Sequence, residues 1–371
     1  MSNRLKRLLA LATAVCTLFT CTALGEGASG DAAVEEEITL DDQSDSSLYI
    51  DEGAQDTIDT LDEEVDTSVD PDSLELNTNL PDNVVNILLI GVDTRDKEVT
   101  EGMQHADVQI ILSINKDDGT IKLSSIMRDL YVTIPTRKSK ARINTSYSGK
   151  TGGGELAMRT VNHNFEMNIE YYVTINFYGL ASIIDAIGGV DVELTKTEAG
   201  AINTYLRKHP PAYDNKASGE RVALEKKAGV QHLDGVQAVM YARLREIDND
   251  FNRTARQRNL LDLLLKTIMQ DMTVDKLISL METSLPYVKT NVNASTMLEL
   301  GTSVLGSGII ARAQAGESLI DQMRIPLDET WKYGDANGSS VIMFRTGKRL
   351  QENIEALHTF IYGQYYAAPE E

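Results

Sequence analysis

The stretch IEYYVTINFYGLASIIDAIGGVDVEL, residues 169–194, contains the alternation of elements that decides the fold class. Its first part, Ile169 to Asn176, is rich in β-branched and aromatic residues and predicts a strand. Tyr178 to Ile187 predicts a helix that ends at Gly188-Gly189, and Val190 to Leu194 predicts the next strand. Strand, helix and strand in succession indicate an α/β sandwich, in which helices cover a sheet.

The same alternation continues on both sides of this stretch. Apolar runs with a period of two predict further strands, and apolar residues at helical spacing predict further helices. Strands are expected at residues 84–90, 107–115, 120–127, 130–135, 318–325 and 340–344. Helices are expected from about residue 153 and at 234–242, 251–269, 274–283, 295–304 and 348–361, with a polar surface insertion at 207–232.

Charge is distributed very unevenly along the 371 residues, whose formal net charge is -21. Residues 26–83 hold 20 of the 56 acidic side chains and no Lys or Arg. From residue 84 onward there are 36 acidic and 32 basic residues, so the folded part is nearly neutral. No basic face or aromatic-interleaved stripe is present, which argues against a nucleic-acid surface.

The N-terminal segment, residues 1–25, has the charge layout of an export signal. Arg4, Lys6 and Arg7 precede the apolar run Leu8 to Leu24. From composition, both a cleaved signal peptide and an uncleaved membrane anchor are open. In either case the basic flank predicts that the rest of the chain lies outside the cytoplasm.

The acidic segment 26–83 is poor in aromatic residues and rich in Asp, Glu, Ser and Thr. Such a composition buries too little apolar surface to offset the entropy of ordering, so we expect a disordered linker. The folded domain is expected at residues 84–365. Both cysteines, Cys16 and Cys21, lie in the N-terminal apolar run, so disulfides and thiolate metal sites play no part in that domain.

Arginines and aspartates recur beside apolar runs between Asp93 and Gln257. Guanidinium groups bind phosphate through two parallel hydrogen bonds, and paired carboxylates hold the divalent cation that accompanies a pyrophosphate. A site with both kinds of group indicates a pyrophosphate-bearing ligand. The residues concerned are Asp93, Arg95, Asp107, Arg128, Arg142, Arg243, Arg245, Arg253, Arg256 and Gln257.

Asp93 and Asp107 are the candidate metal ligands. Asp93 directly follows a predicted strand and a glycine, and Asp107 opens the next predicted strand. Two carboxylates at the mouths of adjacent strands would share one Mg²⁺ that keeps several waters. The structural alternative for Asp93 is that it merely starts a turn.

Each arginine also has a structural interpretation. Arg128 would form a local salt bridge with Asp129, and Arg243 and Arg245 would be a solvated surface pair. If their segment is extended, Arg243 and Arg245 face the same way. Further along, the offsets of zero, three and four place Arg253, Arg256 and Gln257 on one helical face.

These blocks together resemble one family, the LytR-CpsA-Psr proteins of bacterial cell-wall assembly. The resemblance runs from about Asn86 to Leu264 and extends more weakly to the C-terminal helix. Its markers are the run NILLIGVD at 86–93, Arg128-Asp129, Arg142-Ile143-Asn144, Tyr171-Tyr172, IGGV at 187–190 and the stretch 233–257.

The resemblance implies an extracytoplasmic phosphotransferase that moves a glycopolymer from a polyprenyl-pyrophosphate carrier onto peptidoglycan through a phosphodiester. It implies a three-layer α/β sandwich with a mixed central sheet and an apolar pocket for the prenyl chain. It also implies Mg²⁺ or Mn²⁺ as cofactor. Because the family usually keeps an N-terminal membrane helix, it favours an anchor over a cleaved signal.

By position, the resemblance assigns the metal to Asp93 and Asp107. It assigns the catalytic roles to Asp93, Arg128, Arg243 and Arg245. The pyrophosphate is assigned to Arg95, Arg128, Arg142, Arg243, Arg245, Arg253 and Gln257. Two positions depart from the family pattern: His105 stands where Arg is common, and Thr145 where His is frequent.

Two other functions fit the same residues. A hydrolase would release phosphate from prenyl pyrophosphate with this same set of cations and carboxylates. A non-catalytic lipid-binding regulator at the membrane would use the arginines for binding alone. Transfer to peptidoglycan oligomers, compared with transfer to water, separates the first of these from a transferase.

Overall fold

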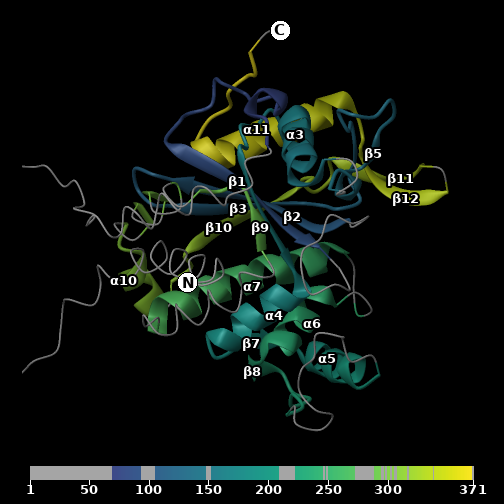
Figure 1. Ribbon diagram of the computed structural model, residues 1–371. Coiled ribbons are helices and arrows are strands. Elements are labelled where there is room, and N and C mark those ends of the chain that lie inside the picture. The colour runs from purple at the N-terminus through teal and green to yellow at the C-terminus, as the bar shows by residue number, and fades with distance from the viewer. Residues whose placement is uncertain are drawn as a thin grey trace, which may run out of the picture.

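A six-stranded sheet forms the middle layer of the protein in the computed structural model (Figure 1). Its strand order is β10-β3-β2-β1-β6-β9, in which β10–β3 and β1–β6 are parallel and the other pairs antiparallel. The sheet is therefore mixed, as expected. Its strands are Val84–Val92 (β1), Ala106–Asn115 (β2), Ile121–Ile126 (β3), Tyr171–Asn176 (β6), Val288–Thr290 (β9) and Ile320–Ile325 (β10).

The structure describes most of the chain from Val69 to Pro369. No helix in this part is both long enough and apolar enough to span a membrane. The segment 1–25 and residues 26–68 lie outside it. The described residues are 69–92, 105–147, 152–208, 222–244, 247, 250–271, 288–293, 296, 299–300, 303–304, 307–315, 317–336 and 338–369, without the side chains of 269–271, 310, 313 and 314.

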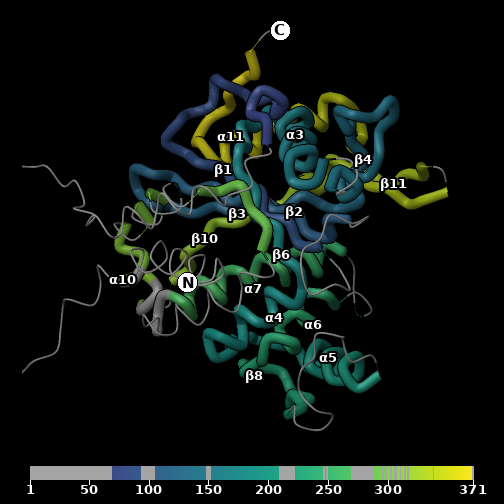
Figure 2. Tube along the Cα trace, in the orientation of Figure 1, coloured from purple at the N-terminus to yellow at the C-terminus, as the bar shows by residue number. Residues whose placement is uncertain are grey.

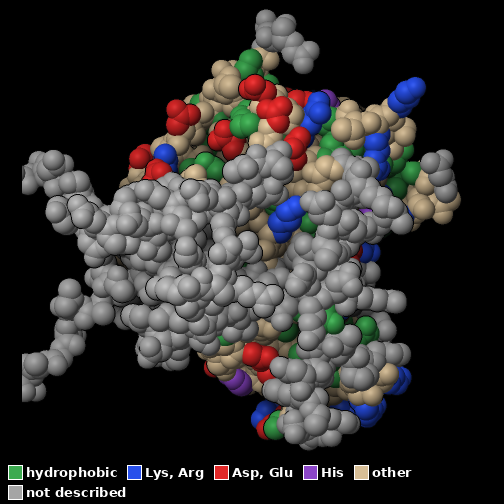
Figure 3. Space-filling view, viewed as in Figure 1, with side chains coloured by type: hydrophobic (Ala, Val, Ile, Leu, Met, Phe, Trp, Pro, Cys, Tyr) green, Lys and Arg blue, Asp and Glu red, His purple; other side chains and the backbone are tan. Residues whose placement is uncertain are grey.

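Two helices cover one face of the sheet, α3 (Gly153–Phe165) and α11 (Gly347–Tyr362), as Figures 1 and 2 show. Their apolar sides form one core with strand residues such as Leu88. Gly154 allows α3 to approach the sheet closely, because a Cβ at this position would lie 2.6 Å from the ring of Tyr172. In the space-filling view, acidic side chains gather over this layer (Figure 3).

The long helix α7 (Asp250–Asp271) crosses the opposite face (Figure 1). An apolar cavity of about 400 Å³ lies between the helix and the sheet. Leu261 and Leu265 of α7 line it together with Leu123 of β3 and Ile320 of β10. The lining side chains that the structure describes are all aliphatic, so the space is suited to a hydrocarbon chain.

Beyond α7 lies a third helical layer with its own core (Figure 1). Helices α4 and α6 are in close contact at Gly235, where a Cβ would come within 1.9 Å of the Ala181 carbonyl oxygen. Asp234 and Gln237 cap α6 reciprocally, which explains why the helix begins here. The elements of this layer are Phe177–Ala186 (α4), Val190–Leu194 (β7), Lys196–Lys208 (α5), Gly229–Leu233 (β8) and Gly235–Arg243 (α6).

Short elements complete the fold. The hairpin β11–β12 projects from the body beside the small pair β4–β5 (Figure 1). These elements are Pro71–Ser73 (η1), Tyr131–Val132 (β4), Ala141–Arg142 (β5), Ile143–Thr145 (η2), Ile309–Gln314 (α10), Trp331–Ala336 (β11) and Ser339–Phe344 (β12).

The fold class was predicted correctly, but the order begins earlier than the expected boundary at Val84. Leu74 and Leu80 are 1% and 3% exposed, and the Asn77 amide donates to Met167 O at 3.0 Å. Residues 69–83 therefore pack on the domain rather than belonging to a disordered linker. Two buried leucines anchor this segment, which average composition does not reveal.

Several predicted elements also need correction. The expected insertion at 207–232 overlaps α5 and β8, and β8 pairs with β7 and buries Leu233 completely. The strand expected at 130–135 is only two residues long, since a turn begins at Pro135. Helices α5 and α10 and strands β5, β8, β9 and β11 were not predicted. The helix expected at 274–283 and half of the one expected at 295–304 lie outside the described residues.

Candidate functional site

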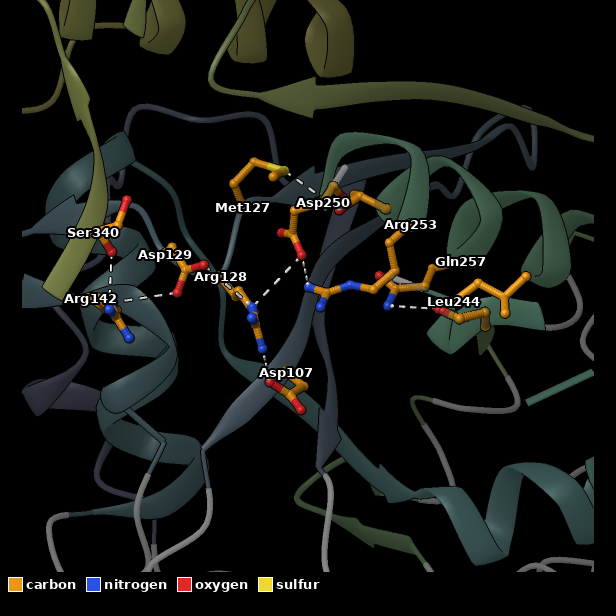
Figure 4. A network of polar contacts seen from close by, with 12 residues as sticks. Asp107, Met127, Arg128, Asp129, Arg142, Leu244, Asp250, Arg253, Gln257 and Ser340 are labelled. Atoms are coloured by element: carbon orange, nitrogen blue, oxygen red, sulfur yellow. Dashed lines mark hydrogen bonds and ion pairs between the residues drawn. The ribbon is translucent and has the colours of Figure 1, made fainter. Parts of the chain in front are cut away.

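Arg128 is the centre of a network of charged side chains at one end of the sheet (Figure 4). It follows β3 and Met127, and its Nη1 donates to Asp107 Oδ1 at 2.7 Å. Its Nε lies 3.5 Å from Asp129 Oδ2 and 3.8 Å from Asp250 Oδ1. Three carboxylates, from β2, the loop after β3 and α7, therefore surround one guanidinium.

Two further arginines extend the network on either side (Figure 4). Arg142 Nε lies 3.6 Å from Asp129 Oδ1, and its Nη2 donates to Ser340 O at 3.0 Å. On the other side, Arg253 Nη2 lies 2.7 Å from Asp250 Oδ1. Cation and anion alternate from Arg142 to Arg253, so opposite charges hold each guanidinium in place.

The electrostatic environment keeps Arg128 charged. Burial acts to lower the pKa of Arg128, but the hydrogen bond with Asp107 and the charges of Asp129, Asp107 and Asp250 outweigh it and raise that pKa above its ordinary value. The Arg128 side chain is 20% exposed and that of Arg253 only 3%. Permanently charged, partly desolvated guanidinium groups bind phosphate oxygens strongly.

The backbone explains why these groups meet. Strands β2 and β3 are antiparallel, and Gln109 lies opposite Ile126. Continuing this register by two residues places Asp107 opposite Arg128. The Arg142-Ile143-Asn144 motif completes the arrangement, because the Asn144 amide donates to the Arg128 carbonyl at 3.2 Å.

Arg243 lies at the same end of the sheet. Its guanidinium is 4.2 Å from the centroid of the Phe177 ring, which follows the last residue of β6. In the β1–β6 register Asn176 is opposite Val92, the residue before Asp93. Arg243 is the last residue of helix α6, so the expected extended segment does not begin there.

Arg253, Arg256 and Gln257, which were predicted to share one helical face, contact two different groups of residues. Arg253 joins the charged network, whereas Arg256 Nη2 donates to Leu244 O at 2.7 Å. Gln257 Nε2 donates to Ala242 O at 3.4 Å and lies beside Arg253 (Figure 4). Gln257 thus holds the last turn of α6 and Arg256 the residue that follows it, whereas Arg253 contacts the network.

Three predicted site residues, Asp93, Arg95 and Arg245, lie outside the described residues. Asp107 is described, but the expected metal pair with Asp93 is not. Within the described ranges, no three His, Cys, Asp or Glu side chains are grouped so that they could hold a metal ion. His105 is exposed just before β2.

The prediction missed two aspartates as members of the site. Asp129 was considered only as a local partner of Arg128, yet it also contacts Arg142. Asp250 connects Arg128 with Arg253. Its spacing of three residues before Arg253 on a helix was the available signal, because such pairs share a face.

The apolar cavity and the network occupy successive parts of the same elements. Leu123 lines the cavity, and β3 then leads to Arg128. On α7, Leu261 lines the cavity, and Arg253 lies about two turns nearer the start of the helix. An apolar surface followed by a charged one suits a ligand that consists of a hydrocarbon chain and a charged head group.

Comparison with known protein families identifies the class of protein to which this fold and charged site belong. The chain belongs to the LytR_cpsA_psr family, whose sequence model matches residues 46–353. This confirms the resemblance seen in the sequence.

Individual relatives agree with this assignment. The chain is 29% identical over 247 residues to the polyisoprenyl-teichoic acid–peptidoglycan teichoic acid transferase TagV of Bacillus subtilis (strain 168), covering 63% of this chain and 58% of TagV. It spans about half to two thirds of the length of the curated relatives it matches.

Solved structures share the fold. The crystal structure of B. subtilis TagV is 25% identical, with a TM-score of 0.55, and the match covers 78% of this chain and 100% of that one. The family protein YwtF (TagT) with bound octaprenyl pyrophosphate lipid is 19% identical, with a TM-score of 0.52, covering 76% and 91%.

Proposed function

We propose that the protein is a phosphotransferase that moves a glycopolymer from a polyprenyl-pyrophosphate carrier onto peptidoglycan through a phosphodiester. The observation that carries the proposal is the charged network around Arg128, together with an aliphatic cavity further along β3 and α7. Family membership and the name of TagV support it, as does the octaprenyl pyrophosphate lipid bound to TagT.

The network suits a diphosphate because its guanidinium groups are already positioned. Asp129 and Asp250 hold the forks of Arg142, Arg128 and Arg253 before a ligand arrives. An incoming diphosphate replaces some of these carboxylate contacts with phosphate contacts, so little side-chain ordering remains to oppose binding. The prenyl chain lies in the aliphatic cavity, where burial of apolar surface stabilises it.

In the proposed reaction, a hydroxyl oxygen of peptidoglycan forms a bond to the phosphorus linked to the sugar. The bond from that phosphorus to the bridging oxygen breaks, and prenyl phosphate leaves with the electron pair. The hydroxyl proton passes to a base, for which Asp93 is the candidate. Arg128 and Arg253 stabilise the negative charge that develops on the phosphate oxygens.

Mg²⁺ or Mn²⁺ fits the donor chemistry of this site. Asp107 offers a hard carboxylate oxygen beside the cations, and its side chain is 20% exposed. Asp107, together with Asp93, would hold the ion, which when bound supplies additional positive charge to the phosphates.

The site of action in this proposal is the outer face of the membrane. The basic flank of the N-terminal segment, the acidic segment after it and the absence of cysteine from residues 22–371 all agree with export. The membrane then supplies the lipid carrier and the wall supplies the acceptor.

The test is transfer of a glycan from a synthetic prenyl-pyrophosphate donor to peptidoglycan oligomers, with purified full-length protein. We expect Asp107→Asn to reduce the transfer rate about 100-fold, since both the metal ligand and the partner of Arg128 are altered. Asp321→Asn, an exposed change of the same kind on β10, should keep wild-type activity.

The acceptor in the same assay separates the competing functions. Release of free glycan phosphate in water at the rate seen with peptidoglycan would show a hydrolase. Donor binding without turnover under all metal conditions would show a lipid-binding protein. Either result rejects the proposed transferase.

A further inference from the structure

A second pair of arginines lies outside the Arg128 network, where α7 faces the edge strand β10. Arg258 Nε donates to Gln322 Oε1 at 3.1 Å, and its Nη1 is buried and makes no hydrogen bond. Arg324, two residues further along β10, has its guanidinium 4.3 Å from the centroid of the Phe251 ring. Its described ion-pair partner is Asp328, a side chain that is 87% exposed.

The positive charge of Arg324 acts unfavourably on the Arg258 guanidinium. Burial lowers the pKa of Arg258, and the positive charge of Arg324 lowers it further. In the part of the chain that the structure describes, no carboxylate lies within ion-pair distance of Arg258. A desolvated cation without an anion is unfavourable for folding, and a second cation beside it adds to this cost.

This pair is the polar continuation of the aliphatic cavity. Arg258 precedes Leu261 and Leu265 by three and seven residues, so all three lie on one face of α7. On β10, Ile320 lines the cavity, and alternate residues of a strand share a face, which places Gln322 and Arg324 on that face too.

Strand β3 shows the same change from apolar to polar. Leu123 lines the cavity, and Ser125, two residues on, lies opposite Arg324 in the parallel register. The Ser125 hydroxyl is buried and makes no hydrogen bond. On β3, β10 and α7, the aliphatic lining of the cavity is therefore followed by a polar side chain that can donate a hydrogen bond to an anion. These side chains are Ser125, Arg324 and Arg258.

The pair is distinct from the diphosphate site described above. Arg253 and Arg258 are five residues apart on α7, which separates their directions by about 140° around the helix axis. Arg253 points to Asp250 and Arg128, whereas Arg258 contacts β10. In the contacts shown for the described residues, neither Arg258 nor Arg324 joins the Arg128 network.

We propose that Arg258 and Arg324, with Gln322 and Ser125, form a second anion subsite that takes the phosphate of an amphiphile whose hydrocarbon chain lies in the cavity. This proposal rests on the proposed function, which identifies the hydrocarbon as the prenyl chain of a lipid carrier. The lipid monophosphate that remains after transfer has the required chemistry: one phosphate monoester on an apolar tail. The subsite thereby gives the leaving lipid phosphate a position apart from the Arg128 network.

The experiment measures binding of farnesyl monophosphate, farnesol and inorganic phosphate to the full-length protein in metal-free buffer. The wild-type protein should bind the monophosphate about tenfold or more tightly than the alcohol, since charge-assisted hydrogen bonds are gained. Arg258→Gln and Arg324→Gln should bring the two affinities together and leave farnesol binding unchanged. Arg349→Gln, which removes an exposed guanidinium from α11, is the matched control and should behave as wild type.

Thermal unfolding shows whether a variant that loses monophosphate binding is still folded. Without ligand, Arg258→Gln should melt at or above the wild-type temperature, because the repulsion with Arg324 is removed. Its stabilisation by farnesyl monophosphate should nevertheless be smaller. A structural role for Arg258 predicts a lower melting temperature instead and would overturn the inference.

The remaining outcomes also decide the matter. If Arg128→Gln alone removes the preference for monophosphate over farnesol, the phosphate sits in the Arg128 network; the second subsite is then rejected and the proposed transferase stands. If inorganic phosphate binds as tightly as the monoester, the cavity contributes nothing and the amphiphile assignment is wrong. Loss of transfer activity in Asp107→Asn is measured separately and tests the proposed function alone.

Discussion

Asp107 and Arg128 lie opposite each other across the β2–β3 pair and share a hydrogen bond of 2.7 Å, although 21 residues separate them in the chain. This contact joins the expected metal ligand to the central cation. The position of each group therefore depends on the other, and the pair is the most direct place to test the site.

Arg128→Lys retains the positive charge but removes the planar fork. We expect the transfer rate to fall about 100-fold, because a lysine reaches only one of the oxygens that the guanidinium holds together. The measurement is glycan transfer at saturating donor, with Arg349→Lys as the control at an exposed ion pair. A variant that keeps a third or more of the wild-type rate would remove Arg128 from the catalytic set.

Asp250→Asn tests the aspartate that sequence reasoning missed. The change preserves shape but removes the charge that holds Arg253 at 2.7 Å and lies 3.8 Å from Arg128 Nε. We expect kcat to fall about tenfold as both forks lose their orientation. KM for the donor should stay level or fall, because the site becomes more positive.

The control for this change is Asp191→Asn, an exposed aspartate paired with His232 on the β7–β8 hairpin. Asp191→Asn removes one negative charge, as Asp250→Asn does, but on a hairpin that contains no residue of the Arg128 network. Equal kinetic constants for Asp250→Asn and wild type would show that Asp250 has no positioning role.

Gly235→Ala should destabilise the contact between α4 and α6. The added Cβ would lie 1.9 Å from Ala181 O, so one of the helices must shift, and we expect a loss of about 3 kcal/mol in the free energy of unfolding. Gly200→Ala on α5 is the matched control, since a Cβ there meets nothing within 4 Å. It should gain about 0.5–1 kcal/mol through helix propensity. Denaturant titration measures both, and equal stabilities would contradict the packing described.

His358 gives the protein a specific response to acid. Its side chain is completely buried, Nε2 lies 3.0 Å from Phe165 O, and the Tyr366 amide donates to Nδ1 at 3.4 Å. Burial lowers the pKa of His358, and these hydrogen bonds only partly oppose that effect. The folded state therefore keeps His358 neutral at a pH where the unfolded chain has already bound a proton.

Because the folded pKa is depressed, this contribution to stability is fully present above the unfolded pKa of about 6.5 and is lost as the pH falls below it. Between pH 6.5 and pH 5.5 the wild-type free energy of unfolding should fall more steeply than that of His358→Gln. Above pH 7.5 the two slopes should coincide, which serves as the internal control. Parallel curves over the whole range would show that the pKa of His358 does not differ between the folded and unfolded protein.

Local patterns predicted most of the central sheet and its flanking helices. Strands β1, β2, β3 and β6 lie in short, largely apolar runs, which are typical of strands covered on both faces. Elements that lack such a pattern were missed. Strand β9 has three half-buried residues, and β11 alternates without strong apolar positions.

The candidate site was predictable in its residue types but not in its contacts. Arg128, Arg142 and Arg253 were selected by their chemistry, and the structure brings them into one network. Arg256 has the same chemistry, yet its guanidinium holds Leu244 O and lies 3.5 Å from Glu198. Spacing along a helix places side chains on a face but does not say what that face meets.

The sequence by itself determined the α/β alternation, the family and the set of cations and carboxylates, because these follow from local periodicity and from side-chain chemistry. Only the tertiary structure decided that Asp129 and Asp250 connect three arginines, and that Arg258 contacts β10, the strand of Arg324, beside an aliphatic cavity. Such contacts depend on strand register and on the packing of α7 across the sheet. They join residues distant in the chain, where local sequence carries no information about distance.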